Sequence, residues 1–148
     1  GPSAADMADV VKSKAAEQDI IIMTAAVADF CPSHPADEKI KKNDSSYESV
    51  IELERTEDIL SYLGAHKAKG QLICGFSMET QNMLENSKAK LAKKNADMIV
   101  ANNLKVAGAG FGTDTNVVTL ITADDCTELE IMDKSCVAAR IMDRLLQM

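Results

Sequence analysis

The segment DIIIMTAAVADFCPSHPADEKIKKN, residues 19–43, decides the fold of this chain. It begins with the apolar run Ile20–Met23, and a short unbroken run of this kind is typical of a strand buried in a parallel sheet. Small residues then lead to the acid Asp29, and the segment ends in a lysine cluster that includes Lys39. Ligands of open α/β sheets bind beyond the carboxyl ends of the strands. We therefore expect a ligand site where this segment leaves the strand.

The residue types in this segment suit a phosphorylated ligand. A turn of small residues lets a ligand approach the backbone, the carboxylate of Asp29 can hold a metal ion, and Lys39 can neutralise an anion. Each residue also has a simpler interpretation. Asp29 can be a turn or helix-capping residue, and a basic loop end is most often solvated. The segment alone predicts half of a nucleotide site and leaves both interpretations open.

The composition is that of one acidic globular domain. Gly1 and Pro2 resemble the scar of a cleaved tag, so we expect one domain over residues 3–148 of this 148-residue chain. A net charge of −7 argues against nucleic acid as a partner, and no apolar run approaches the ~18 residues of a membrane span. The cysteines show no C-x-x-C pairing, which favours reduced thiols in a cytoplasmic protein over a zinc site.

Predicted strands and helices alternate along the rest of the chain. Apolar runs predict strands over residues 20–27, 72–76 and 97–101, and a weak alternation that puts Ile51 and Leu53 on one face predicts a further strand over 47–54, with helices before, between and after these strands. This alternation predicts an α/β fold with a Rossmann-like, doubly wound and mainly parallel sheet. After a long loop over residues 102–115, a hairpin formed by 116–122 and 127–132 and a final amphipathic helix complete the prediction.

The predicted helices have expected caps and inward faces. Ser3 and Thr56 are expected to cap the first two helices, with Glu57 and Asp58 in the first turn of the second. Residues at helical spacing, all of them apolar except Ser87, are predicted to face inward. These are Met7, Val10, Val11 and Ala15 in the first helix, Met83, Leu84, Ser87 and Leu91 in the third, and Val137, Ala138, Ile141, Met142 and Leu145 in the last, while Val118, Leu120, Leu129 and Ile131 alternate in the hairpin.

Three further residues are candidates for the site. Lys90 and Lys94 lie four apart on one helix face, where like charges cost about 0.2–0.5 kcal/mol, a cost consistent with a bound anion. The alternative is a solvated lysine face. Phe76, at the end of a strand, either closes the core or stacks on a base. The glycines at 108–112 match neither a dinucleotide fingerprint nor a phosphate-binding loop, which excludes a standard dehydrogenase.

Four ordered motifs resemble a known family. The first motif combines AAVADF at residues 25–30 with KIKK at 39–42, and the other three are GFSMET at 75–80, DMIVANN at 97–103 and GFGTDTNVVTLI at 110–121. Together they resemble the phosphopantothenate–cysteine ligase domain of coenzyme A biosynthesis, the bacterial type commonly fused to a flavin-dependent decarboxylase. The resemblance covers nearly the whole chain, and the ordered set is far more specific than any single motif.

The resemblance implies a two-step ligation that uses CTP. In that family the phosphopantothenate carboxylate attacks the α-phosphate of CTP, and the amine of cysteine then displaces CMP from the acyl-cytidylate. Such activation depends on positioning and charge neutralisation by lysines and Mg²⁺. The resemblance also implies a cytoplasmic homodimer with small-molecule substrates and no flavin on this part of the chain.

The resemblance assigns roles to individual residues. Lys39 would be catalytic, carrying the acyl-cytidylate onward in the partner's site, and Asp29 would serve the metal region. Lys90 and Lys94 match the triphosphate-binding lysines. The full set of implied nucleotide-binding residues is Met23, Thr24, Ala25, Asp29, Lys39, Glu57, Asp58, Ile59, Phe76, Lys90 and Lys94.

The chain also departs from the family pattern. Thr56-Glu57-Asp58-Ile59 stands where the family has Asn-Pro-Asp-Ile, and Phe30 replaces a tyrosine. The glycine-rich strand–loop–helix that begins the family's domain has no counterpart, so we expect the first strand–loop–helix units to be missing and the domain to be partial. Two hypotheses follow: a CTP-dependent ligase, or a catalytically inactive fragment that binds CTP and dimerises.

Overall fold

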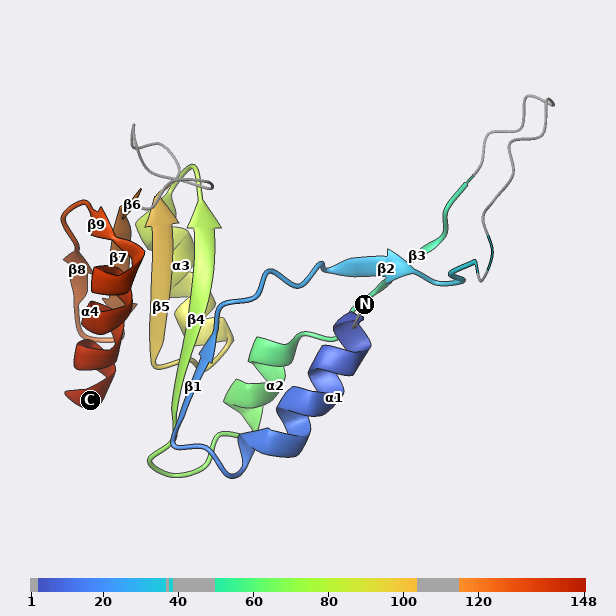
Figure 1. Cartoon of the computed structure of the whole chain (residues 1–148), viewed down its shortest axis with the longest axis horizontal. Coiled ribbons are helices and arrows are strands. Elements are labelled where there is room, and N and C mark those ends of the chain that lie inside the picture. The colour runs from blue at the N-terminus through green and yellow to red at the C-terminus, as the bar shows by residue number, and fades with distance from the viewer. Residues whose placement is uncertain (1–2, 37, 39–49, 104–114) are drawn as a thin grey trace.

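A five-stranded sheet forms the centre of the computed structural model, which describes residues 3–36, 38, 50–103 and 115–148 (Figure 1). Its strand order is β1-β4-β5-β7-β8. The strands are β1 (Ile20–Met23), β4 (Leu72–Glu79), β5 (Met98–Asn103), β7 (Val118–Thr122) and β8 (Cys126–Glu128). The first three run parallel, and the β7–β8 hairpin continues the sheet antiparallel. The predicted α/β class and the predicted C-terminal hairpin are thus confirmed.

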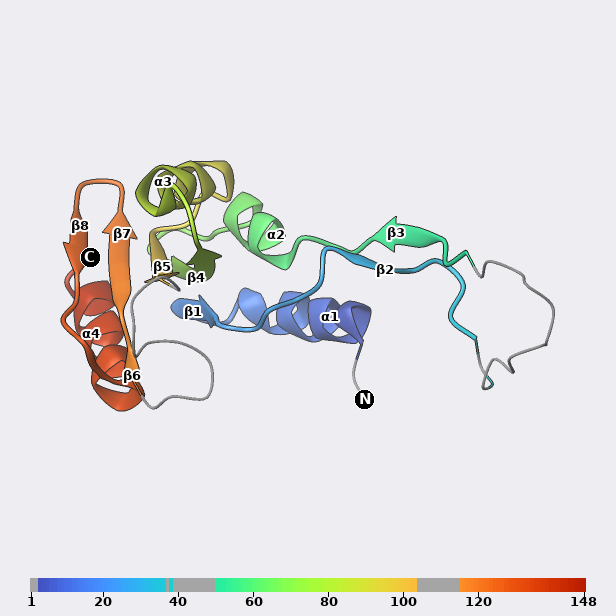
Figure 2. The ribbon, with the colours of Figure 1, turned by 90° about the horizontal axis from the view of Figure 1, so that it is seen from above.

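Helices cover both faces of this sheet (Figure 2). They are α1 (Ala4–Ala15), α2 (Ile59–Ala65), α3 (Met83–Lys93) and α4 (Lys134–Leu146). Successive strand residues point to opposite faces, so Ile73 and its neighbour Cys74 belong to different core clusters. Ile73 packs with α1 and α2, whereas Cys74 packs with α4. The predicted doubly wound arrangement is therefore present.

The ends of α1 and α2 test the predicted caps. Ser3 caps α1 through a reciprocal bond with Asp6, as expected. The prediction for α2 was wrong: Asp58 is the N-cap, its side chain accepts a hydrogen bond from the backbone of Ser61, and Glu57 lies before the helix. Thr56 instead uses its hydroxyl to donate to the backbone carbonyl of Ala28. Thr56 and Asp58 lie two positions apart and both are residue types that cap helices, and Asp58 occupies the cap.

The inward faces are narrower than predicted. In α3 the buried residues are Ser87 and Leu91, and in α4 they are Val137, Ile141 and Leu145. Several positions that were predicted to face inward are exposed because each helix touches the sheet along a single stripe. The exposed helix positions are Val10, Leu84, Ala138 and Met142, and Ile131 of the predicted hairpin, which lies between β8 and β9, is exposed as well.

Two strands leave the main sheet and form an arm. Strand β2 (Phe30–Pro32) pairs antiparallel with β3 (Leu53–Arg55), and this pair extends away from the sheet (Figure 1). The prediction of a strand over 47–54 within the parallel sheet was wrong, because residues 50–52 are not in a strand and β3, which begins at Leu53, pairs only with β2. The alternation that suggested a half-buried strand therefore belongs to an exposed ribbon. A second small pair joins β6 (Thr115–Asn116) to β9 (Met132–Asp133).

Candidate functional site

A pocket of about 240 Å³ opens beyond the carboxyl end of β1, between the base of the arm, the start of α2 and the last turns of α3. The predicted site residues that line it are Met23, Ala25, Asp29, Glu57, Asp58, Ile59, Phe76, Lys90 and Lys94. Thr24 lies between Met23 and Ala25 in sequence but does not line the pocket. Lys39 lies outside the residues that the structure describes. Val27, Thr56 and Leu60 also line the pocket and were missed. Val27 and Leu60 carry no chemical signal in sequence, and Thr56 was assigned to a helix cap.

Backbone bonds at the base of the arm bring Asp29 to α2. The backbone N–H of Thr56 donates to the Asp29 carbonyl at 3.0 Å, and the Thr56 hydroxyl donates to the Ala28 carbonyl. These contacts hold the residues before α2 against the segment that leaves β1. As a result, two stretches far apart in sequence share one wall of the pocket.

Lys94 and Asp58 connect α3 to the start of α2. The Lys94 ammonium donates to Asp58 Oδ2, while Asp58 Oδ1 accepts the Ser61 backbone N–H at 2.9 Å. Partial burial raises the pKa of the Asp58 carboxyl, but the hydrogen bonds from Lys94 and Ser61 outweigh it and leave that pKa below its ordinary value. Asp58 is therefore a carboxylate at neutral pH, and it competes with any bound anion for the Lys94 ammonium.

Lys90 has a different environment. Its half-buried ammonium donates to the backbone carbonyl of Phe76 at 2.7 Å. Burial lowers the pKa of Lys90, and the charge of Lys94 lowers it further, against the opposing influence of Glu79, Asp58 and Asp29. A cation placed in a partly desolvated pocket attracts an anion more strongly than one in water. The position of Lys90 thus favours an anion site over a solvated lysine face.

Phe76 lies on the boundary between pocket and core. It packs against the core cluster on the α4 face and also lines the pocket. Its carbonyl is the acceptor that holds Lys90. Phe76 therefore packs as a core residue, as one of its two interpretations predicted. In the pocket, its backbone carbonyl holds the ammonium of Lys90 in place.

The charges of the pocket are largely paired. Glu57 accepts a hydrogen bond from Lys12 at 2.6 Å, and Asp58 accepts one from Lys94. Among the described residues, no group of three or more His, Cys, Asp or Glu side chains could hold a metal ion. Mg²⁺ is usually held by one or two carboxylates together with substrate phosphates, and Asp29 fits that more limited role. None of the described helices has the length and apolar character needed to cross a bilayer.

Fold and pocket together define a class of protein: an α/β protein with a lysine-lined pocket at the carboxyl edge of its parallel strands, where open α/β sheets bind their ligands. The family model for the DNA/pantothenate metabolism flavoprotein C-terminal domain matches residues 2–148. The chain belongs to this family.

Similar proteins come from coenzyme A biosynthesis. The chain is 48% identical over 144 residues to the coenzyme A biosynthesis bifunctional protein CoaBC of Bacillus subtilis (strain 168), covering 97% of this chain and 35% of that protein. The chain thus spans about a third of the length of that relative.

Solved structures share the fold. The crystal structure of the C-terminal domain of a CoaBC protein matches with a TM-score of 0.77 and 40% identity, covering 99% of this chain and 65% of that chain. A Cab2 mutant in complex with phosphopantothenate-cysteine matches with a TM-score of 0.69 and 17% identity, covering 99% of this chain and 52% of that chain. At that identity, the second match shows the fold alone.

Proposed function

We propose that the pocket binds CTP and that the protein acts in the ligation of phosphopantothenate to cysteine. The observation that carries the proposal is the convergence of Lys90 and Lys94 with Asp29 in one pocket at the carboxyl edge of the sheet. Two ammonium groups suit a polyphosphate, and a carboxylate beside them suits the metal ion that accompanies one. The similarity to CoaBC supports the same reaction.

Each part of the nucleotide has a proposed neighbour. The backbone of Met23, Thr24 and Ala25 lies near the cytosine, and Lys90 and Lys94 hold the triphosphate. Asp29 holds Mg²⁺ together with phosphate oxygens. When bound, the ion supplies charge neutralisation at the phosphates.

The proposed reaction has two balanced steps. A carboxylate oxygen of phosphopantothenate forms a bond to the α-phosphorus of CTP, and the bond from that phosphorus to pyrophosphate breaks. The cysteine amine then forms a bond to the acyl carbon, CMP leaves with the bonding pair, and the amine gives up a proton. The described lysines contribute by holding phosphate charge in place, because this chemistry needs positioning more than a nucleophilic side chain.

Lys39 is proposed to act in the second step, from the neighbouring subunit of a homodimer. The observation that supports a dimer is the exposed apolar surface of the arm, where Phe30, Ile51 and Leu53 are 51%, 67% and 60% exposed. In the complete enzyme, Lys39→Gln should leave pyrophosphate release intact and slow formation of the amide. Normal amide formation in that variant would remove Lys39 from the mechanism. The proposed compartment is the cytoplasm.

Calorimetric titration of this chain with CTP and with ATP tests the nucleotide site. We expect saturable binding with preference for CTP, and absence of binding to either nucleotide would contradict the proposal. The same sample should be assayed for pyrophosphate release with phosphopantothenate and cysteine present.

The alternative function is a fragment that binds CTP and dimerises without turnover. The observations that suit it are the pocket and the exposed apolar side chains of the arm, since binding and association need no turnover. Binding without pyrophosphate release would support this alternative, and measurable ligation by the chain would refute it.

A further inference from the structure

The C-terminal end of α3 packs directly on α2. Helix α3 ends at Lys93 with Lys94 as its C-cap, and Asn95 follows in the left-handed conformation with φ of 49°. The Asn95 N–H donates to the Ala92 carbonyl at 3.2 Å, and the Ala96 N–H donates to the Leu91 carbonyl at 3.1 Å. This pair of bonds is a Schellman turn, which fixes the direction in which the chain leaves a helix. The backbone of Lys94 is therefore held by the turn that follows it.

Gly64 allows this turn to lie against α2. A Cβ atom at Gly64 would lie 1.7 Å from the Lys94 carbonyl oxygen and 2.8 Å from the Lys94 carbonyl carbon. Both atoms belong to the backbone, so a side chain at Gly64 requires the two helices to separate. The missing side chain thus determines how closely the last turn of α3 approaches α2.

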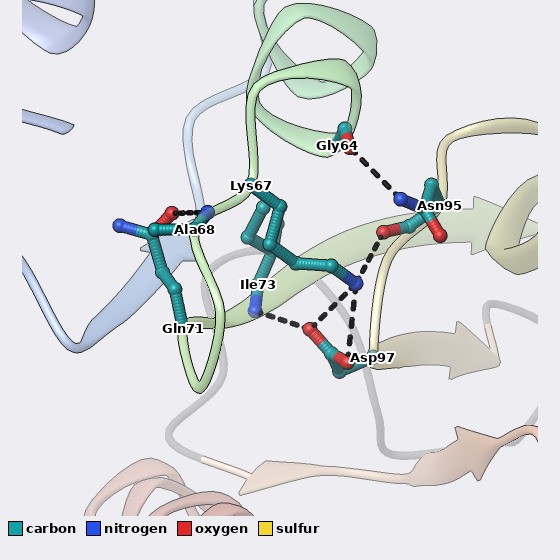
Figure 3. Close-up of polar contacts among 7 residues, drawn as sticks. All are labelled: Gly64, Lys67, Ala68, Gln71, Ile73, Asn95 and Asp97. Atoms are coloured by element: carbon teal, nitrogen blue, oxygen red, sulfur yellow. Dashed lines mark hydrogen bonds and ion pairs between the residues drawn. The ribbon is translucent and has the colours of Figure 1, made fainter. Parts of the chain in front are cut away.

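Polar contacts fix the same junction (Figure 3). The Asn95 side-chain amide donates to the Gly64 carbonyl at 2.8 Å. Lys67, just beyond α2, donates to the Asn95 carbonyl at 3.0 Å and to Asp97 at 3.3 Å. Asp97 also accepts the Ile73 backbone N–H at 2.8 Å. The end of α2, the end of α3 and strand β4 are therefore connected in one network.

Lys94 joins this network to the pocket. Its carbonyl touches Gly64 near the C-terminal end of α2, while its ammonium pairs with Asp58 at the N-terminal end of the same helix. A shift of α3 relative to α2 would move the Lys94 ammonium along the pocket wall. Lys90, one turn earlier, is held separately by the Phe76 carbonyl.

We propose that Gly64 and Asn95 are positioning residues that set the place of the Lys94 ammonium in the pocket. Neither residue lines the pocket in the described part of the chain, so they act through Lys94. This inference rests on the proposed function in one respect, namely that the pocket binds a polyphosphate. It adds that two residues outside the pocket help to set the affinity for that polyphosphate.

The variants Gly64→Ala and Asn95→Gly test the two contacts separately. Gly64→Ala forces the helices apart, whereas Asn95→Gly keeps the left-handed turn and removes the amide donor. Gly70→Ala is the matched control, because Gly70 has φ of 82° and its Cβ would meet nothing within 4 Å. This control adds backbone strain to the chain without touching the junction.

Two measurements are made on each variant. The first is the dissociation constant for CTP, expected to rise roughly tenfold or more in Gly64→Ala, since a charge-assisted contact is displaced. That rise should vanish when Gly64→Ala is combined with Lys94→Ala. The second is a carbon-13 NMR titration of the Asp58 carboxyl, whose pKa should rise in Gly64→Ala and in Asn95→Gly but not in Gly70→Ala.

The outcomes separate this inference from the proposed function. If the unaltered chain binds no CTP, the proposed function fails and the Asp58 titration alone decides the positioning role. An unchanged Asp58 titration in Gly64→Ala and Asn95→Gly overturns the inference, as does a loss of affinity that persists in the Lys94→Ala background. If Gly64→Ala fails to fold, Asn95→Gly decides by the same criteria.

Discussion

At the scale of single residues, Lys90 and Lys94 differ although both lie on one face of the same helix. Lys90 is held by a neutral carbonyl, so its full charge is available to a ligand. Lys94 is paired with the Asp58 carboxylate and must share its ammonium between Asp58 and any phosphate. Lys90 should therefore contribute more to anion affinity than Lys94.

Replacement of Lys90 tests the anion site directly. Lys90→Ala should weaken CTP binding by about 1.5–3 kcal/mol, because a charge-assisted contact is lost. Lys93→Ala removes the same charge from an exposed position of the same helix and should leave affinity nearly unchanged. Calorimetric titration measures both. Equal affinity of Lys90→Ala and the unaltered chain would restore the solvated-face interpretation.

The lowered pKa of Lys90 predicts a pH dependence of binding. Burial and the neighbouring Lys94 charge place this pKa below 10.5, so the free protein loses the proton at a lower pH than an ordinary lysine. Bound phosphate favours the charged form, and CTP affinity should therefore fall as pH rises through the lowered pKa. The free energy of unfolding changes in the opposite direction. Between the lowered pKa of the folded protein and the ordinary lysine pKa of 10.5, the unfolded chain still holds the Lys90 proton that the folded protein has lost, so stability rises with pH.

Lys90→Arg provides the control for this pH dependence. Arginine keeps its charge up to a pKa above about 12, so the alkaline loss of affinity should become shallower in the variant. Titrations between about pH 7 and about pH 10 cover the range in which lysine can lose its proton. An identical pH profile for lysine and arginine would assign the loss to another group.

At the scale of elements, α2 is short and depends on its ends. Asp58→Ala removes both the cap and the ion pair with Lys94, and should lower the free energy of unfolding by about 1 kcal/mol. Asp58→Asn retains a capping side chain and should lose less, because an ion pair whose carboxylate is about half exposed contributes little. Urea unfolding at neutral pH measures both. A loss in Asp58→Asn as large as in Asp58→Ala would show that the charge, and not the cap, stabilises α2.

The elements that could be predicted from sequence are the strands that pack in the core, because burial leaves an apolar run in the sequence. The central strands β4 and β5 pack on both faces, and the half-buried edge strand at Ile20–Met23 also contacts both core clusters, so the apolar sequences of all three show where they lie. Strand β3 could not be placed, because its short alternation is shared by half-buried strands and exposed ribbons. The cap of α2 was misplaced because Thr56 and Asp58 have similar capping tendencies and their tertiary contacts decide between them.

The residues of the candidate site also divide into those that could be predicted from sequence and those that could not. Charged residues at the carboxyl ends of strands and on one helix face could be identified, and they meet in one pocket. Gly64 and Asn95 could not be recognised, because the sequence carries no sign that two helix ends touch there. Lys39 lies outside the described residues, and its role remains a prediction from the family resemblance.

At the scale of the whole molecule, the arm is the feature that a compact domain does not explain. Its apolar side chains are exposed, and its strands pair only with each other in the described part of the chain. Exposed apolar groups gathered on one projecting ribbon favour contact with another protein surface. A second copy of the chain is the proposed partner.

Charge on the arm should prevent this association. Leu53→Asp should convert a dimer into a species of 15.9 kDa in analytical ultracentrifugation, because a carboxylate is costly to bury in an apolar interface. Leu146→Asp, at a 71% exposed position on α4, is the matched control and should not change the mass. A monomeric unaltered chain, or a Leu53→Asp dimer, would contradict the proposed interface.

The base of the arm gives the pocket a second role. Asp29 and Thr56 line the pocket and, through the 3.0 Å bond between their backbones, also join the two strands of the arm to each other at its base. A ligand that favours one angle of the arm therefore changes the free energy with which two copies of the chain associate through their arms. By thermodynamic linkage, association of the two copies must change the affinity for the ligand by the same factor. Nucleotide titrations at low and high protein concentration should therefore give different dissociation constants. The ratio of these constants would measure the coupling between neighbouring subunits.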